Sequence, residues 1–105
     1  MNDATIERAV ALLLQAAPPG TRVIVFGSHG RGSARASSDL DLLVIEPRVQ
    51  SRREEMVRLA DVLRPLRIPV DVVVVSRETF EQWADTPGTI LYEAAREGRV
   101  FGEVA

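Results

Sequence analysis

The 105-residue sequence has no cysteine, no lysine and a single histidine, His29. Without cysteine the chain can form neither a disulfide nor a thiolate nucleophile, and it cannot build a cysteine-ligated zinc site. The absence of lysine excludes a Schiff-base amine and the lysine of a phosphate-binding P-loop. One histidine cannot make a multi-histidine metal site, so carboxylates, hydroxyls and arginines are the candidates for any chemistry.

Long apolar runs and a strong net charge are also missing. The stretch "VDVVVV" is far too short to span a bilayer, and the beginning, "MNDATIERA", lacks a signal-peptide core. We therefore expect a cytoplasmic protein without a membrane partner. The net charge of −2 gives no electrostatic footprint for direct nucleic-acid binding. The length and the hydrophobic content of 46% fit one globular domain over residues 1–105.

Hydrophobic periodicity predicts an α/β or α+β fold in which helices cover a small sheet. Strands are expected over residues 22–27, 39–46, 69–76 and 99–103. Helices are expected over residues 4–17 with Asp3 as N-cap, from the Ser51 cap to Pro65, from the Ser76 cap to Trp83, and from Thr86-Pro87 to Gly98. The segment "SHGRGSA" predicts a short helix that begins at Gly27-Ser28.

Two aspartates, Asp39 and Asp41, stand at the start of the second expected strand, "DLDLLVIE". Since alternate residues of a strand point to the same face, their carboxylates are neighbours while Leu40 faces a core. Asp71, near the start of the third strand, joins them if the two strands are adjacent. Three carboxylates repel one another unless a cation neutralises them, and oxygen ligands alone favour Mg²⁺ or Mn²⁺. A solvated or salt-bridged strand end is the simpler alternative for each acid.

The first strand ends at Gly27-Ser28, which lead into the expected short helix. Backbone N–H groups at a helix start suit phosphate oxygens, and the Ser28 hydroxyl adds a donor. A tight turn with a serine cap is the alternative. The phosphate-binding turn and the acidic cluster together predict phosphoryl or nucleotidyl transfer, with two metal ions about 3.5–4 Å apart bridged by Asp39 and Asp41.

A dinucleotide-binding fold is a rival interpretation, because Gly27, Gly30 and Gly32 follow a strand and Glu46 ends the next one. The spacing, however, is G-x-x-G-x-G rather than the G-x-G-x-x-G of that fingerprint. The connection to the second strand is also too short for a crossover helix, and 105 residues leave no room for a complete doubly wound sheet. The rival is therefore disfavoured.

The stretch "GSHGRGSARASSDLDLLV" resembles the signature of the nucleotidyltransferase superfamily related to DNA polymerase beta. That signature has Gly-Ser, an Arg-Gly pair a few positions on, and Asp-x-Asp in the next strand. The sequence most resembles the minimal nucleotidyltransferases, small proteins paired with HEPN-domain toxins in toxin–antitoxin modules. The similarity covers nearly the whole chain, since "VDVVVVS" fits the third-acid strand and "TILYEAAREGRVF" fits the C-terminal segment. It implies a small mixed sheet covered by helices.

The resemblance also implies how the site residues divide the work. Gly27 and Ser28 would hold the triphosphate of ATP. Asp39 and Asp41 would be ligands of Mg²⁺, expected as two ions. Asp71 would be the third carboxylate, which binds metal and helps to deprotonate the acceptor hydroxyl.

Further positions leave alternatives open. Arg31 occupies the arginine of the signature, and it either contacts phosphate or anchors the loop through a salt bridge. His29 falls at a variable position and is expected to be an exposed loop residue without a role. Trp83, Tyr92 and Phe101 fit ordinary core packing better than a partner-facing surface.

Members of this family are thought to transfer AMP from ATP to a tyrosine of the HEPN toxin, which silences a ribonuclease. Because the chain has the length of the catalytic core alone, the resemblance implies that a partner supplies the acceptor. We therefore expect a protein adenylyltransferase that acts as an antitoxin, with a HEPN-domain toxin and ATP as partners. Two alternatives remain: an antitoxin that acts by binding alone, and the catalytic subunit of a small-molecule nucleotidyltransferase.

Overall fold

The computed structural model describes residues 2–32, 34 and 38–103. Its helices are α1 (Asp3–Ala16), α2 (Gly27–Arg31), α3 (Arg52–Leu63), α4 (Arg77–Trp83) and α5 (Ile90–Glu97), with a 3-10 turn, η1 (Arg64–Leu66), after α3. Its strands are β1 (Arg22–Phe26), β2 (Leu40–Glu46), β3 (Val70–Ser76) and β4 (Arg99–Glu103). Every helix and strand expected from the sequence is present, and the differences lie in where some of them begin.

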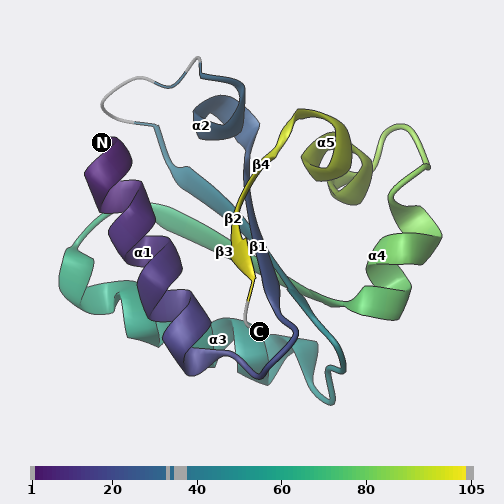
Figure 1. Ribbon diagram of the computed structural model, residues 1–105, viewed down its shortest axis with the longest axis horizontal. Helices are drawn as coiled ribbons and strands as arrows, with labels where there is room; N and C mark the ends of the chain where they lie inside the picture. Colours follow the sequence, from purple (N-terminus) through teal and green to yellow (C-terminus); the bar gives the residue numbers. More distant parts are fainter. Residues whose placement is uncertain (1, 33, 35–37, 104–105) are drawn as a thin grey trace.

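The four strands form one mixed sheet in the order β3-β2-β1-β4. β1 pairs antiparallel with β2 and with β4, whereas β2 and β3 run parallel. Figure 1 shows α1 and α3 on one side of this sheet and α4 and α5 on the other. The prediction of a small mixed sheet covered by helices is confirmed.

β2 is the strand that carries the Asp-x-Asp sequence into the core. Leu40 and Leu42 pack in the cluster shared with α1 and α3, while Leu43 and Ile45 pack in the cluster next to α4 and α5. A strand covered on both faces consists almost entirely of apolar residues. Asp41 is only half-buried because it lies at the open end of this strand, where the layers of helices no longer enclose it completely.

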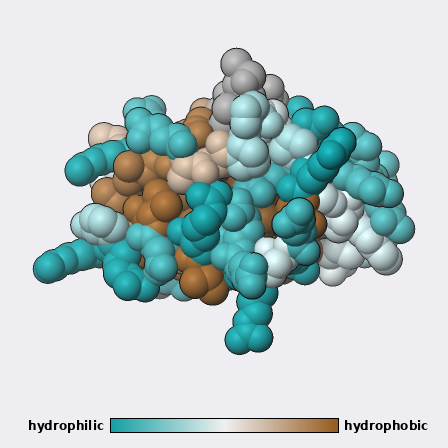
Figure 2. Space-filling model, turned by 90° about the horizontal axis from the view of Figure 1, so that it is seen from below, coloured by the Kyte–Doolittle hydropathy of each residue, from teal (hydrophilic) through white to brown (hydrophobic). Residues whose placement is uncertain are grey.

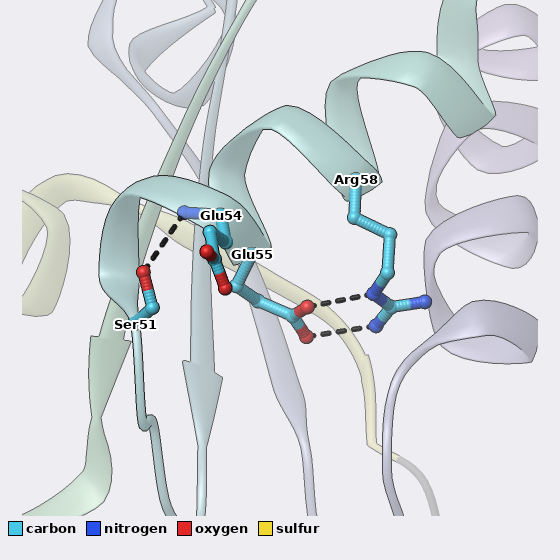
Figure 3. A network of polar contacts seen from close by, with 4 residues as sticks. All are labelled: Ser51, Glu54, Glu55 and Arg58. Atoms are coloured by element: carbon cyan, nitrogen blue, oxygen red, sulfur yellow. Dashed lines mark hydrogen bonds and ion pairs between the residues drawn. The ribbon is translucent and has the colours of Figure 1, made fainter.

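Two serines cap helices where the sequence predicts them. At the start of α3, Ser51 Oγ accepts a hydrogen bond from Glu54 N at 3.3 Å (Figure 3). At the start of α4, Ser76 Oγ accepts one from Thr79 N at 3.1 Å. Such caps can be predicted from sequence because each is completed within a single helical turn.

The predicted cap of the first helix is wrong. Asn2, rather than Asp3, caps α1, and its Oδ1 accepts a hydrogen bond from Thr5 N at 2.9 Å. Both residue types serve well as N-caps, so composition alone does not separate two adjacent candidates. The backbone decides, because Asn2 has the extended conformation of a cap and Asp3 is already helical.

The predicted start of the last helix is also wrong. Thr89, rather than Thr86, caps α5, and its Oγ1 accepts a hydrogen bond from Tyr92 N at 3.1 Å. Gly88 has a φ of +89°, a left-handed conformation that no helix continues through. The chain therefore turns after Pro87, and the helix begins later than the Thr-Pro pair suggests.

Some apolar side chains remain at the surface. Figure 2 views the molecule from the side on which α3 lies and shows an apolar area bordered by hydrophilic side chains. Val57 of α3 and Trp83 at the end of α4 are both exposed, whereas Phe101 packs against the core. No helix in the described part of the chain is both long and apolar enough to cross a membrane.

Candidate active site

Pairing of β2 with β3 brings two of the three predicted acids together. Asp41 and Asp71 are the second residues of these parallel strands and are Cα partners in the register. Paired residues of neighbouring strands point to the same face of a pleated sheet. Asp39 precedes β2 and is exposed beside them. The condition set by the sequence, that the second and third strands be neighbours, is therefore met.

The electrostatics of Asp41 reflect this grouping. Partial burial raises the pKa of the Asp41 carboxyl above its usual value, and the charges of Asp71, Asp39 and Glu93 raise it further, in that order. His29 acts in the opposite direction and lowers the pKa of Asp41. The pair of predicted partner acids is thus close enough to repel the negative charge of Asp41, and a bound cation would relieve that repulsion.

The acids suit a hard cation in chemistry, although their side chains do not converge on one point. Within residues 2–32, 34 and 38–103, no group of three acidic or histidine side chains is arranged to hold a metal ion. The oxygen donors themselves are those that Mg²⁺ prefers. Asp39 and Asp71 are exposed, so rotation of their side chains toward Asp41 is not blocked by packing. The backbone places the donors, and the ligand role stays a prediction.

Gly27 joins the end of β1 to this acidic group. It has a φ of +67°, and a Cβ built on it would overlap Oδ2 of Asp41 and lie 3.2 Å from Cγ of the same residue. Phe26, the residue before it, is the Cα partner of Asp41 across the β1–β2 pair. Only glycine satisfies both the backbone conformation and the close approach. The predicted phosphate-binding turn therefore lies directly against the Asp-x-Asp strand.

The turn continues into α2, as the sequence predicts. Phe26 stands at its N-cap position and provides no side-chain hydrogen bond to the helix. Ser28 is half-buried in its first turn. Phosphate binding by Gly27 and Ser28 stays a prediction, but the strand-to-helix geometry that it requires is present.

Arg31 forms salt bridges, which is one of the two roles that the sequence leaves open for it. Its Nη1 lies 2.7 Å from Oε1 of Glu93 and 3.5 Å from Oε2 of Glu97, both on α5. These ion pairs anchor α2 to α5 across a long separation in sequence. A phosphate contact by Arg31 stays a prediction, which the ion pairs neither require nor prevent.

Two residues of the site region escape prediction from sequence. His29 is buried, with 5% of its surface exposed, so its expected position in an exposed loop is wrong. It lies inside α2, and its Nε2 is 3.2 Å from the carbonyl oxygen of Ser38. Glu93 of α5 is the other, since its charge acts on Asp41. No local pattern marks Glu93, whereas a lone histidine between the Gly-Ser and Asp-x-Asp sequences could have been noticed.

The sheet is mixed, acidic residues lie at the starts of two neighbouring strands, and a glycine turn packs against them. Together these features define an α/β nucleotidyltransferase fold. The family model described as "Nucleotidyltransferase domain" matches residues 6–96, so the chain belongs to this family. The predicted class of enzyme, a nucleotidyltransferase, is thereby confirmed. No curated protein matches the sequence.

Solved structures share the fold at low sequence identity. A protein from Sulfolobus solfataricus, assigned as a nucleotidyltransferase, has a TM-score of 0.67 and 18% identity, over 95% of this chain and 78% of that one. A chain of a toxin–antitoxin complex with AMP-PNP has a TM-score of 0.65 and 20% identity, over 93% and 73%.

A third similar structure is the complex of the tri-AMPylated Shewanella oneidensis HEPN toxin with its MNT antitoxin. The TM-score is 0.65 and the identity 17%, over 99% of this chain and 74% of that one. At these identities the three structures establish the fold. The predicted resemblance to the nucleotidyltransferases is confirmed by the family model, and an MNT antitoxin complex is among the structures that share the fold.

Proposed function

We propose that this protein is a Mg²⁺-dependent adenylyltransferase of a toxin–antitoxin pair, which transfers AMP from ATP to a tyrosine hydroxyl of a HEPN-domain toxin in the cytoplasm. The observation that carries the proposal is the contact between the two halves of the site. Gly27 lies against the Asp41 carboxylate, and Asp71 is the register partner of Asp41. A triphosphate at the turn would thus lie beside the acids that would hold its metal ions.

The site residues divide the work in this scheme. Gly27 and Ser28 bind the triphosphate through backbone N–H groups and the serine hydroxyl. Asp39 and Asp41 would hold the metal ions, and Asp71 would complete their ligands and accept the proton of the acceptor hydroxyl. The acceptor oxygen bonds to the α-phosphorus of ATP, and the bond from that phosphorus to the departing pyrophosphate breaks. Two Mg²⁺ ions would supply charge neutralisation at the phosphates and lower the pKa of the acceptor hydroxyl.

Binding of the cation and ATP would draw the acids together. The pKa of Asp41 is raised in part by Asp71 and Asp39, so the three carboxylates repel one another when no positive charge lies between them. The exposed side chains of Asp39 and Asp71 can turn toward the ion at little cost in packing. We infer that the metal site forms together with nucleotide binding.

The choice of partner is supported by the similar structures. One of them is a tri-AMPylated HEPN toxin with its MNT antitoxin, and another is a toxin–antitoxin complex with AMP-PNP. The two matches cover 93% and 99% of this chain. A HEPN-domain protein is therefore the partner that we propose. A tyrosine as the modified residue follows only from the resemblance of the sequence to the minimal nucleotidyltransferases.

An antitoxin that acts by binding alone is the second candidate function, and the catalytic subunit of a small-molecule nucleotidyltransferase is the third. The grouping of three acids beside Gly27 disfavours the binding candidate, because burial of Asp41 and then the charges of Asp71 and Asp39 oppose its charged form, a cost that a site without a cation would not offset. Small-molecule transfer predicts label on an added alcohol rather than on a protein partner.

One experiment separates these functions. The protein is mixed with labelled ATP, Mg²⁺ and the HEPN-domain product of the adjacent gene, and label on that product is measured. We expect labelling by the wild type and by Asp61→Asn, a control at an exposed acid of α3, and none by Asp39→Asn/Asp41→Asn. If the double variant neutralises the toxin as well as the wild type does, binding alone explains the activity.

A further inference from the structure

We propose that His29 is a positioning residue, which fixes the backbone next to Asp39 by donating a hydrogen bond to the Ser38 carbonyl. This inference rests on the proposed function, since it concerns how the metal-binding acids are held. His29 Nε2 lies 3.2 Å from Ser38 O, across a connection that joins the phosphate-binding helix to β2. A carbonyl oxygen only accepts hydrogen bonds, so Nε2 must carry the hydrogen.

Asp39 is held on both of its sides by backbone contacts. Before it, the carbonyl of Ser38 is bound by the His29 ring. After it, Leu40 N donates to the carbonyl oxygen of Pro69 at 2.9 Å. The Asp39 side chain is itself exposed, so packing constrains it little. These two hydrogen bonds therefore constrain the direction in which the carboxylate leaves the backbone.

α2 provides a rigid base for the imidazole. A Cβ built on Gly30 would lie 2.7 Å from the carbonyl oxygen of Val25, so this turn of the helix rests directly on β1. Arg99 Nη2 donates to the carbonyl oxygen of His29 at 3.1 Å, which ties the same residue to β4. The ion pair of Arg31 with Glu93 holds the end of α2 against α5.

One residue therefore links the two halves of the site. α2 begins at Gly27, which lies against Asp41, and its His29 holds the peptide group next to Asp39. With only 5% of its surface exposed, the ring is placed to act through the backbone and not to touch substrate. Loss of the hydrogen bond would leave Gly27 against Asp41 but would loosen the backbone on the N-terminal side of Asp39.

Two variants test this role. His29→Leu removes the donor and keeps a buried side chain of similar size, while His29→Gln keeps an N–H donor. In the labelling reaction we expect His29→Leu to lower kcat about tenfold, the effect of one lost buried hydrogen bond. We also expect it to raise the half-maximal Mg²⁺ concentration about threefold or more, and to change the KM for ATP less than about twofold. His29→Gln should retain at least about half of the wild-type kcat.

Ser76→Ala is the matched control for stability. It removes a helix-capping hydrogen bond at the opposite end of β3 and should lower the melting temperature without changing the Mg²⁺ dependence. Two results would overturn the positioning role: wild-type kcat and Mg²⁺ dependence in His29→Leu, or an equal loss in His29→Gln and His29→Leu. A uniform loss that tracks the melting temperature, as in the control, would also overturn it.

A second measurement is independent of activity. His29 is the only histidine, so all imidazole ¹⁵N signals of the protein belong to it. In mildly alkaline buffer we expect the proton on Nε2, and a proton on Nδ1 would overturn the hydrogen bond to Ser38. If wild type transfers no label while Nε2 carries the proton, the proposed function fails and the contact stands. Weaker Mg²⁺-dependent binding of AMP-PNP by His29→Leu, measured by calorimetry, would then still show that the contact positions Asp39, and unchanged binding would refute it.

Discussion

Gly27 lies directly against the carboxylate of Asp41, so that a Cβ built on the glycine would overlap Oδ2 of the aspartate. These residues come from different strands, the end of β1 and the start of β2, whose antiparallel pairing makes Phe26 and Asp41 register partners. The contact explains why a Gly-Ser sequence and an Asp-x-Asp sequence belong together in this protein. It also makes a glycine substitution an informative test.

Gly27→Ala should lower both stability and activity. A left-handed φ costs an alanine about 1–2 kcal/mol, and the collision with Asp41 adds to that cost. We expect labelling to fall at least about 100-fold, because the displaced Asp41 no longer aligns with the triphosphate. Urea unfolding and the labelling reaction measure the two effects.

Gly88→Ala is the matched control for this substitution. Gly88 has a φ of +89°, and a Cβ there would meet nothing within 4 Å. It should therefore show the backbone cost of about 1–2 kcal/mol alone, with near wild-type labelling. Equal losses of activity in the two variants would contradict a special contact between Gly27 and Asp41.

The Arg31–Glu93 ion pair allows its two possible tasks to be separated. The side chains are 44% and 38% exposed, so the pair should stabilise the protein by only about 0.2–1 kcal/mol in a double-mutant cycle. If Arg31 also contacts phosphate, Arg31→Ala should raise the KM for ATP several-fold while Glu93→Gln leaves it nearly unchanged. A matching rise in both variants would indicate that Arg31 acts only as an anchor.

Asp41→Asn should stabilise the ligand-free protein while it abolishes ligand binding. The raised pKa of Asp41 means that its folded environment opposes the charged form, which asparagine lacks. We expect a gain of less than about 1 kcal/mol in the free energy of unfolding without ligand. Mg²⁺ with ATP should raise the melting temperature of the wild type and not that of the variant. Destabilisation of the ligand-free variant would count against mutual repulsion among the acids.

A second group of acids, at the other end of β2, should make stability depend on pH. Glu46 is 3% exposed, and its Oε2 has no hydrogen-bond partner within the described residues. Burial, followed by a hydrogen bond with Glu55 and the charge of Glu55, raises the pKa of Glu46 to about 8. Arg58 binds Glu55 through two hydrogen bonds of 2.6 and 2.7 Å (Figure 3), and this contact lowers the pKa of Glu55.

The signs of these two shifts are opposite. Glu46 stays protonated in the folded protein where it would be ionised in the unfolded chain, so its contribution to stability is lost as pH rises from about 4.5 to about 8. Glu55 contributes stability above its unfolded pKa, which is lost as pH falls below about 4.5. Urea unfolding should therefore show lower stability at pH 8 than near pH 5, and Glu46→Gln should flatten that decline. An equally steep decline in Glu46→Gln would assign it to other groups.

Local sequence determined most of the secondary structure. The caps at Ser51 and Ser76 and the short helix after Gly27-Ser28 follow from residues within one turn of each other. The errors at Asn2 and Thr89 have the same origin, because two cap-competent residues stood near each helix start and only the backbone chose between them. The candidate acids could be selected as well, since a carboxylate at the start of an apolar strand calls for a charge partner.

Tertiary structure alone decided how those residues meet. The parallel register of β2 and β3 makes Asp41 and Asp71 partners, and no spacing in the sequence encodes which strands pair or in what alignment. The burial of His29 and the ion pair between Arg31 and Glu93 likewise join segments distant along the chain. The sequence by itself determined which side chains could do the chemistry, through their types and local periodicity. Their positions depend on packing contacts between distant segments throughout the core, which cannot be deduced from any short stretch of sequence.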